Sequence, residues 1–391
     1  MSARQRAPAR RNKPTNVCEQ ASRGDMTHYT WTVIGAGPAG IASVGRLLDH
    51  GVRPNEIAWI DPQFAAGDLG EKWGAVPSNT QVSLFLDYFN ASPAFGFAAA
   101  PHFDLHDIDP QHTCQLGVVA GPLRWVTEHL RAKVAAFQST ATELSLRNQH
   151  WQITTLDGEI SSKNVILAVG STPKKLTYPE LKEIPVEVAL NPEKLAQQQL
   201  DGATVAVFGS SHSTMIALPN LLEHPVHKVI NFYRSPHRYA VPFQDWTLFD
   251  DTGLKGDAAR WARENIDGRH PERLHRCLVD SPEYARLLRE CDQAVYTVGF
   301  ERRHLPLTPQ WGPLEHDGAN GILAPGLFGI GIAFPEYRTD PLGFGEHRVG
   351  MAKFMQRLNS VLPLWLQYGG SPTQAAALCP DGVGLLAGAT A

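Results

Sequence analysis

The residue pattern best suited to chemistry is a glycine-rich turn of the form G-x-G-x-x-G, made by Gly35, Ala36, Gly37, Pro38, Ala39 and Gly40. The first glycine permits a tight turn, the second lets the backbone approach a pyrophosphate, and the third allows close packing of the next helix. The amino terminus of that helix would offer free N–H groups and a favourable dipole to the phosphates. The pattern predicts a dinucleotide site; a structural turn without a ligand is the alternative.

An acidic residue stands where the ribose of that dinucleotide would lie. Asp61 follows Gly40 by 21 residues, at the end of the next expected strand. A carboxylate at this place accepts hydrogen bonds from ribose hydroxyls. Asp61 is therefore predicted to bind the same nucleotide.

A second, degraded copy of the turn begins at Gly209. Ser211 replaces the middle glycine and Thr214 replaces the third small residue, with His212 and Ser213 between them. Ser211 adds a side chain where a pyrophosphate should approach the backbone, although its hydroxyl can itself donate to a phosphate. His212 is expected either to contact the phosphate or to cap the helix. The segment predicts a second, weaker nucleotide site.

The second copy carries the opposite charge at its ribose position. Arg234 follows Gly209 by 25 residues, much as Asp61 follows Gly35 by 26. A guanidinium pairs well with a 2′-phosphate, which a carboxylate would repel. The sequence therefore favours NADP(H) over NAD(H) at this turn. The alternative is a vestigial nucleotide fold with a solvated arginine.

Both turns need a buried strand before them and a helix after them, and the apolar pattern supplies these elements. Each copy reads as a strand, a helix with one apolar face and a returning strand. The expected ranges are 29–34, 39–50 and 56–61 in the first copy, and 204–208, 214–222 and 228–233 in the second.

Other segments frame the two copies. Two apolar strands that each end in a glycine, 165–170 and 294–299, echo one another. A helix is expected over 121–137, and 151–169 reads as an antiparallel meander turned at Asp157-Gly158. The remaining long segments, 62–120 and 240–293, read as cofactor-facing loops and as an irregular helical region without evident chemistry.

The composition limits the class of protein. The chain has 391 residues, of which 43% are apolar and 19% charged, so it can bury the cores of about two domains. Thirty-five Lys and Arg stand against 39 Asp and Glu, for a net charge of −4. A mildly acidic protein of this kind is not expected to have nucleic acid as its main partner.

Neither a redox dithiol nor a membrane span is expected. The five cysteines form no C-x-x-C pair, and no histidine or cysteine spacing suggests a metal site. The longest uncharged stretch, 26–45, contains four glycines and a proline, which is a poor membrane helix. Residues 1–26 and 367–391 are expected to be tails outside the folded domains.

At this point the chain resembles the two-dinucleotide-binding-domain flavoproteins, which include glutathione and thioredoxin reductases and the flavin-containing monooxygenases. The resemblance covers about residues 28–360 and rests on four segments, 33–40, 165–173, 295–300 and 326–331. It implies that the first turn binds FAD, that Gly170 and Gly299 mark the crossings to and from an NADP domain, and that Gly331 lies near the FAD. A helix after Gly345 would point its amino terminus at the flavin.

Two departures narrow the resemblance. The absence of a cysteine pair argues against dithiol chemistry. The Gly-rich segment that ends at Trp73, followed by Asn79, instead looks like the loop and downstream asparagine of flavin-containing and N-hydroxylating monooxygenases. In those relatives the asparagine lies by the flavin. The fingerprint F-x-G-x-x-x-H-x-x-x-[WFY] of Baeyer–Villiger and flavin monooxygenases is absent, so the subgroup stays open. A core role for Trp73 and a loop-capping role for Asn79 are the alternatives.

Weaker candidates follow the last glycine motif. Tyr337 and Arg338, with Glu336 and Asp340 beside them, would lie close to a flavin ring and orient a substrate. A structural ion pair is the alternative interpretation. The catalytic candidates are thus Asn79, Tyr337 and Arg338.

The sequence as a whole predicts an α/β fold in which an FAD-binding Rossmann-like domain, 27–172 and 301–366, is interrupted by a second Rossmann-like domain for NAD(P)H, 173–300. We expect a cytoplasmic NADPH-dependent monooxygenase that acts on a small molecule and forms a homodimer. The alternatives are a flavin reductase with a quinone or another electron acceptor, and a non-catalytic FAD-binding sensor or assembly protein.

Overall fold

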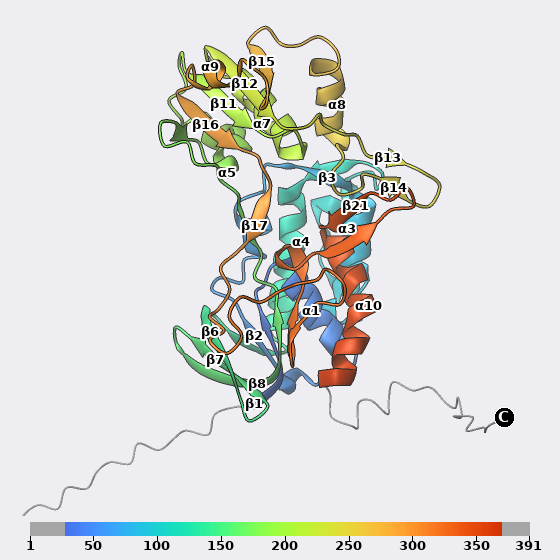
Figure 1. The fold of residues 1–391 in the computed structure, drawn as a ribbon. Coiled ribbons are helices and arrows are strands. Elements are labelled where there is room, and N and C mark those ends of the chain that lie inside the picture. Colours follow the sequence, from blue (N-terminus) through green and yellow to red (C-terminus); the bar gives the residue numbers. More distant parts are fainter. Residues whose placement is uncertain (1–27, 370–391) are drawn as a thin grey trace, which may run out of the picture.

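A computed structural model describes residues 28–369 (Figure 1). The two expected tails therefore lie almost wholly outside the described residues. Two sheets dominate the structure, one at each end of the view in Figure 1, with helices packed on each. Both sheets are built around parallel strands, which confirms the predicted α/β class.

The first sheet has eight strands and contains the first glycine turn. Its path is β18-β19-β8-β1-β2-β5, and β7 and β6 extend it from β8 as an antiparallel meander. The bounds are β1 (His28–Ile34), β2 (Ile57–Ile60), β5 (Ala135–Phe137), β6 (Ala141–Arg147), β7 (His150–Thr155), β8 (Gly158–Leu167), β18 (Ile322–Ala324) and β19 (Leu327–Gly329).

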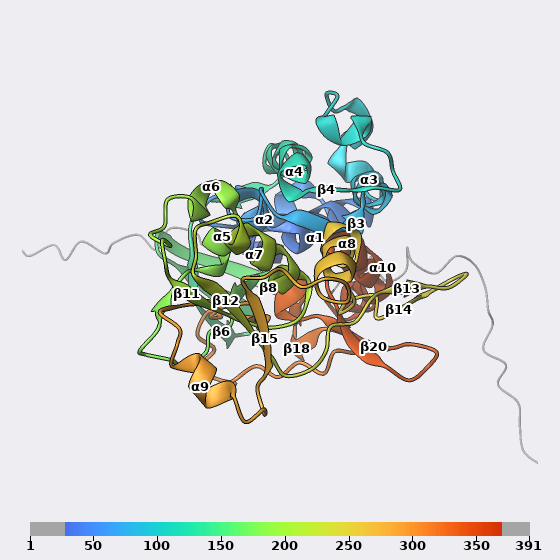
Figure 2. The same cartoon turned by 90° about the horizontal axis from the view of Figure 1, so that it is seen from above.

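Four helices cover one face of this sheet, and the meander covers the other. The helices are α1 (Pro38–Asp49), α3 (Val82–Asn90), α4 (Leu116–Arg131) and α10 (Met351–Gly369). Seen from above, α3 and α4 lie on one side and β6 on the other (Figure 2). Strand β2 shows how both faces of the sheet are buried. Ile57 and Trp59 pack into the core under the helices, and Ala58 and Ile60 pack into the core on the opposite face. All four side chains are fully buried.

One helix prediction is wrong in its bounds. The helix expected over 121–137 begins at Leu116 and ends at Arg131, and Ala135–Phe137 forms the edge strand β5 paired with β2. A short apolar run fits a buried strand as well as a helix, so periodicity alone does not separate them. Pairing with β2 decided the outcome.

The second sheet has five parallel strands in the order β10-β16-β11-β12-β15. The bounds are β10 (Lys182–Glu183), β11 (Thr204–Phe208), β12 (Lys228–Tyr233), β15 (Leu274–Leu278) and β16 (Gln293–Tyr296), with helices α5 (Val186–Ala189), α6 (Pro192–Leu195), α7 (His212–Leu222), α8 (Gly256–Asn265) and α9 (Tyr284–Leu288). Strand β15 and the hairpin of β13 (Val241–Pro242) and β14 (Thr247–Leu248) lie in the region that the sequence left irregular.

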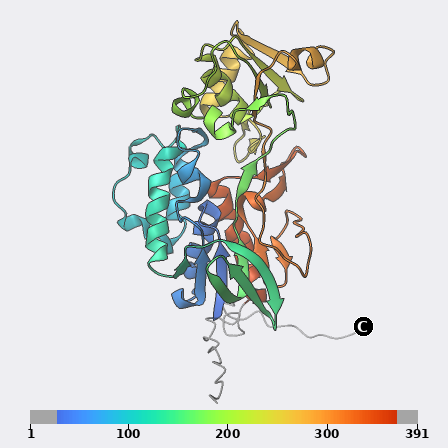
Figure 3. The same ribbon diagram turned by 90° about the vertical axis from the view of Figure 1, so that its left-hand side faces the viewer.

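Two short strands connect the sheets. Strand β9 (Ser171–Pro173) leaves the first sheet after Gly170, and β17 (Phe300–Arg302) returns after Gly299. They pair with each other in antiparallel register, so both crossings run side by side (Figures 1 and 3). The two glycines have φ values of +76° and +93°, and no atom would crowd a side chain at either one. The positive φ of the backbone, and not a lack of space for a side chain, explains why glycine stands at both positions.

Three smaller elements complete the described part. Helix α2 (Gly67–Glu71) and the pair of β3 (Pro77–Gln81) with β4 (Thr113–Gln115) lie between the first turn and α8. A hairpin of β20 (Glu336–Thr339) and β21 (Gly345–Arg348) precedes α10. None of the described helices is both long enough and apolar enough to cross a membrane.

Candidate functional site

The first glycine turn has the geometry that its sequence predicts. A side chain on Gly35, whose φ is +110°, would collide with the carbonyl of Ala168 on the neighbouring strand end. A side chain on Gly40 would collide with the carbonyl of Gly35. At Gly37 the nearest atom to an added Cβ is the Cα of Gly67, 4.0 Å away, so this glycine borders open space. The first and third glycines allow neighbouring backbone segments to pack closely, and the second leaves room for a ligand.

The start of α1 is suited to an anion. Gly37 is the N-cap residue and supplies no side-chain acceptor, and Pro38 stands at the first helical position. The N–H groups of the first turn are therefore available to a bound group. Gly331 lies against this turn, since a side chain there would come within 2.7 Å of the Cβ of Ala39. The structure thus brings Gly331 to the first turn, as expected.

Asp61 organises the turn from the end of β2. Its Oδ2 accepts a hydrogen bond from the N–H of Ala36 at 2.7 Å, and its Oδ1 accepts from the N–H groups of Gln63 and Phe64 at 2.9 and 2.7 Å. The carboxylate is half-buried. Oδ1 thus already accepts two hydrogen bonds, whereas Oδ2 accepts one and keeps a lone pair that can accept a ribose hydroxyl. Ribose binding by Asp61 stays a prediction.

The loop after β2 links the first turn to the crossing strands. Gly67 approaches Gly37, and Asp68 accepts a hydrogen bond from Arg303, just after β17, at 2.7 Å. Trp73 packs against the core of the second sheet, and its ring lies edge-on to Phe300, 6.0 Å between centroids. Trp73 therefore lies at the junction of the two sheets. Its contact with FAD stays a prediction.

The second turn keeps its first glycine and its third small residue. A side chain on Gly209, whose φ is +135°, would come within 2.7 Å of the hydroxyls of Thr297 and Thr214. Thr214 donates to Thr297 at 2.7 Å, and Thr297 donates to the carbonyl of Phe208 at 2.7 Å. Ser211 is the N-cap of α7 and makes no capping bond. Its exposed hydroxyl and that of Ser213 have no partner among the described residues, so both are available to a phosphate.

His212, the candidate phosphate ligand of the second turn, makes a hydrogen bond to another part of the chain. Its Nε2 lies 3.0 Å from the carbonyl of Pro77 on β3, so it joins α7 to the first part of the chain. Burial lowers the pKa of His212, and the bond to Pro77 opposes this shift only in part. A neutral ring that donates from Nε2 fits both facts. Contact of His212 with a phosphate stays a prediction, and its visible role is structural.

Arg234 is free for a ligand. It follows β12 directly, at the sheet edge where β11 ends in the second turn. The side chain is exposed and makes no hydrogen bond or ion pair within residues 28–369. Arg238 and His237, which lie nearby, are occupied: Arg238 stacks 4.8 Å over Phe249, and His237 pairs with Asp267 at 3.1 Å.

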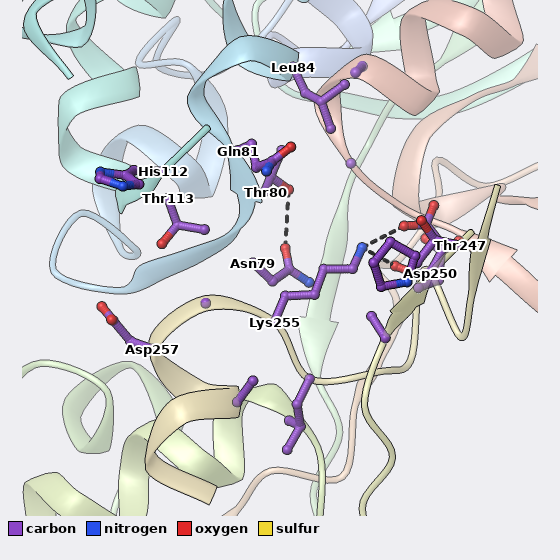
Figure 4. A pocket seen from close by; sticks show the side chains of 18 of the residues that line it. Asn79, Thr80, Gln81, Leu84, His112, Thr113, Thr247, Asp250, Lys255 and Asp257 are labelled. Carbon is purple, nitrogen blue, oxygen red and sulfur yellow. Dashed lines mark hydrogen bonds and ion pairs between the residues drawn. The ribbon is translucent and has the colours of Figure 1, made fainter. Parts of the chain in front are cut away.

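A cavity of about 770 Å³ lies where the two parts of the chain meet (Figure 4). Its walls come from β3 and β4, from the segment 240–263 that includes α8, and from the start of α10. Asn79 lines this cavity beside Thr80, whose hydroxyl donates to its Oδ1 at 3.2 Å. That bond leaves the amide NH₂ group of Asn79 free to donate into the cavity.

The cavity also contains charged residues that the sequence analysis missed, and four of them form one ion-paired network. Asp250 pairs with Lys255 at 2.5 Å and with Lys353, in the first turn of α10, at 2.6 Å. Asp251 pairs with Lys353 at 2.8 Å and accepts from the N–H of Val349 at 2.9 Å. The only sequence signal was the Asp250-Asp251 doublet. Its partner Lys353 is about a hundred residues away, and no spacing rule connects them.

Tyr337 and Arg338 lie outside this cavity. Both are exposed on β20, and the ring of Tyr337 lies edge-on to His347 across the hairpin at 5.1 Å. Glu336 pairs with Arg348 at 3.2 Å and with Arg357 at 3.5 Å, so its structural ion-pair interpretation holds. The structure does not bring Tyr337 and Arg338 together with Asn79.

The described part of the chain offers no cluster for a metal ion, and its thiols are buried. It contains no group of three His, Cys, Asp or Glu side chains that could hold a metal ion. Its cysteines, Cys114, Cys277 and Cys291, are free and buried. Burial raises the pKa of Cys114, and it raises the pKa of Cys291 to about 12, so neither thiol is activated.

Comparisons with known proteins agree with this architecture. No protein-family model matches the chain. Monooxygenase AgnR1 of Paecilomyces divaricatus is 33% identical over 382 residues, which cover 85% of this chain and 97% of that protein.

Solved structures share the fold at low identity. An ornithine N-hydroxylase of Kutzneria sp. 744 superimposes with a TM-score of 0.61 at 13% identity, over 87% of this chain and 99% of that one. The L-lysine 6-monooxygenase of Pseudomonas syringae gives 0.59 at 16%, over 87% of this chain and 100% of that one. The thioredoxin reductase of Lactococcus lactis gives 0.51 at 12%, over 87% and 99%.

Proposed function

The chain belongs to the monooxygenase family of its fungal relative, with the two-domain flavoprotein fold, and we propose that it is an NADPH-dependent FAD monooxygenase of a small molecule. The observation that carries this proposal is the cavity between the two sheets. Asn79 and the start of α10 reach it from one side and α8 from the other. Each sheet contributes its own glycine turn. This arrangement allows two bound nucleotides and a substrate to meet.

The first turn fits FAD. Gly37 borders space that a side chain would fill, and the uncapped start of α1 offers N–H donors to a pyrophosphate. Asp61 and Gly331 are proposed to complete the site at the ribose and the ribityl chain. Gly170 and Trp73 would lie toward the crossing strands. Bound FAD would supply the redox chemistry, taking electrons from NADPH so that one atom of O₂ enters the substrate and the other leaves as water.

The second turn fits NADPH, with Gly209 shaping the loop and Gly299 the returning crossing. The hydroxyls of Ser211 and Ser213 are proposed to donate to the pyrophosphate in place of a second glycine. Arg234 would pair with the 2′-phosphate. The uncapped start of α7 adds N–H donors as at α1.

The residues of the cavity have separable roles in this proposal. Asn79 would donate from its NH₂ group to a bound nucleotide ring or to the substrate, held in orientation by Thr80. The start of α10 would face developing negative charge with its N–H groups. Tyr337 and Arg338, on the neighbouring hairpin, remain candidates for substrate contact outside the cavity.

The domain division follows from the two sheets. We propose that residues 27–172 and 301–366 form the FAD-binding domain and that 173–300 form the NADPH-binding domain. The membership of the strands supports this division, because β10, β11, β12, β15 and β16 make the five-stranded sheet, while β1, β2, β5 to β8, β18 and β19 make the eight-stranded one. A cytoplasmic homodimer is proposed as well; sedimentation velocity of the purified protein measures the oligomeric state.

The decisive experiment is anaerobic mixing of the FAD-loaded protein with NADPH, followed by oxygen uptake. We expect the flavin absorbance to bleach with NADPH and oxygen uptake to rise when a substrate is added. Bleaching with fast electron transfer to a quinone and no oxygenated product would favour the flavin reductase. No bleaching with either nicotinamide nucleotide would favour the non-catalytic FAD-binding protein. Absence of bound FAD would contradict all three functions.

A further inference from the structure

The charges of the cavity bear on which substrates it accepts. Three carboxylates line it, from Asp250, Asp251 and Asp257, and four basic groups, from Lys255, Lys353, Arg260 and Arg263. Every one of the three carboxylates is ion-paired, Asp257 with Arg260 at 2.6 Å. Arg263 stacks 4.3 Å over Tyr239 and has no anionic partner in the described part of the chain. Within the described residues, the wall of the cavity thus has no free carboxylate and one free cation.

The two lysine ammonium groups occupy the places that a cationic substrate would need. Lys353 contacts both Asp250 and Asp251, and its side chain is only 16% exposed. Lys255 bonds the carboxylate of Asp250 at 2.5 Å and its carbonyl at 2.6 Å. Figure 4 shows Lys255 extending from the wall to Asp250. An entering ammonium group would have to displace one of these lysines and leave its charge unpaired, which costs most for Lys353, the more buried of the two.

Apart from these three carboxylates and four basic groups, the wall supplies apolar and neutral polar surface. Leu84, Leu254, Val349 and Met351 supply apolar surface, and Asn79, Thr80, Gln111 and Thr247 supply neutral polar groups. The hairpin that contributes Pro242 and Thr247 also carries Phe243 and Trp246, whose rings stack 4.5 Å apart. Such a wall suits an apolar body with a carbonyl or hydroxyl group that accepts a hydrogen bond.

We propose that Lys255 and Lys353 are built-in counter-ions that determine substrate specificity by excluding cationic amines from this cavity, so that it accepts neutral, largely apolar molecules. This inference rests on the proposed function for its site. It distinguishes this chain in substrate class from the ornithine and lysine hydroxylases that share its fold. The carboxylates that could bind an amine are present but occupied.

The test is a titration of the FAD-loaded protein by isothermal calorimetry with two probes of similar size, phenylpropylamine and benzylacetone. The variants Lys353→Met and Lys255→Met each remove one ammonium group and keep the side-chain length. We expect wild type to bind benzylacetone at least about tenfold more tightly than phenylpropylamine. Each variant should bind phenylpropylamine about tenfold more tightly than wild type does, with benzylacetone changed less than about twofold.

Controls separate this effect from general charge and from folding. Lys228→Met removes a lysine of comparable exposure that pairs with Glu290 far from the cavity, and it should leave both affinities unchanged. Lys353→Arg keeps the counter-ion and should behave as wild type. The proposal is overturned if wild type binds the amine at least as tightly as the ketone, or if neither methionine variant gains amine affinity. Because binding is measured without NADPH, failure here is distinct from failure of flavin reduction.

Discussion

At the scale of single residues, nicotinamide selectivity depends on Arg234. It stands free at the end of β12, while Arg238 is stacked on Phe249 and His237 is paired with Asp267. Arg234→Ala should weaken NADPH about ten- to hundredfold, the loss of a charge-assisted pairing, and leave NADH nearly unchanged. Flavin reduction against the concentration of each nucleotide measures this. Arg238→Ala is the matched control and should have the smaller effect.

Equal losses for NADPH and NADH in the Arg234→Ala variant would show that Arg234 does not contact the 2′-phosphate. In that case the second turn would contact only the groups that NADPH and NADH share.

Gly37 makes a second prediction at this scale. It borders open space beside Gly67, unlike Gly35 and Gly40, whose neighbours are backbone atoms of the fold. Gly37→Leu should therefore weaken FAD retention by at least about tenfold while the apoprotein keeps its folding. Flavin content after gel filtration and the thermal midpoint of the apoprotein report the two effects. Full flavin content in the variant would contradict the proposed pyrophosphate site.

At the scale of elements, the half-buried side chain of His212 ties α7 to β3. Burial lowers the pKa of His212 below its ordinary value of 6.5, so His212 binds a proton less tightly in the folded protein than in the unfolded chain. The contribution of the neutral His212 ring to the free energy of unfolding is complete above about pH 6.5. It declines as the pH falls from 6.5 toward the lowered pKa of the folded state. The loss approaches about 1.4 kcal/mol per pH unit within that window.

His212→Gln should remove this dependence, because glutamine can donate to the carbonyl of Pro77 at every pH. We expect wild type to lose more unfolding free energy than the variant between pH 6.5 and 5.5, by at most about 1 kcal/mol. Denaturant unfolding at the two pH values measures it. His316, whose pKa burial also lowers, stays in both proteins and so cancels in the comparison. Parallel pH profiles would show that His212 does not titrate as its burial implies.

At the scale of the whole molecule, the segment after β14 holds the two parts together over the cavity. Glu346 on β21 accepts from the N–H of Thr252 at 3.1 Å, from its hydroxyl, and from the N–H of Asp251 at 3.3 Å. Glu346→Ala should therefore open this segment, with hydrogen exchange at the amides of Asp251 and Thr252 about ten- to hundredfold faster.

The amide of Leu254 provides an internal control for that measurement. It donates to the carbonyl of Arg238 within the same part of the chain, at 2.7 Å, and does not involve Glu346. Its exchange should stay within about twofold of wild type. Faster exchange at all three amides would indicate unfolding of the segment instead of release from β21.

The sequence by itself determined the two strand, turn and helix units, because short-range patterns of glycine, apolar residues and one charge specify them locally. Gly35, Gly40 and Gly209 lie where their spacing placed them, and the strands that end at Gly170 and Gly299 lead into paired crossings. The parallel sheets and the two-domain flavoprotein fold followed from the repetition of this unit.

Only the tertiary structure decided how the cavity is charged and closed. Asp250 and Lys353 form an ion pair although about a hundred residues separate them in the sequence. His212 bonds the carbonyl of Pro77 on β3 and makes no bond within its own glycine turn. Strand β5 exists because β2 offers an edge, although its apolar run fitted a helix equally well. Such outcomes depend on which surfaces pack together, since an ion pair or an edge pairing has no periodic signature along the chain. Tyr337 and Arg338, close in sequence to the last glycine motif, were placed outside the cavity for the same reason.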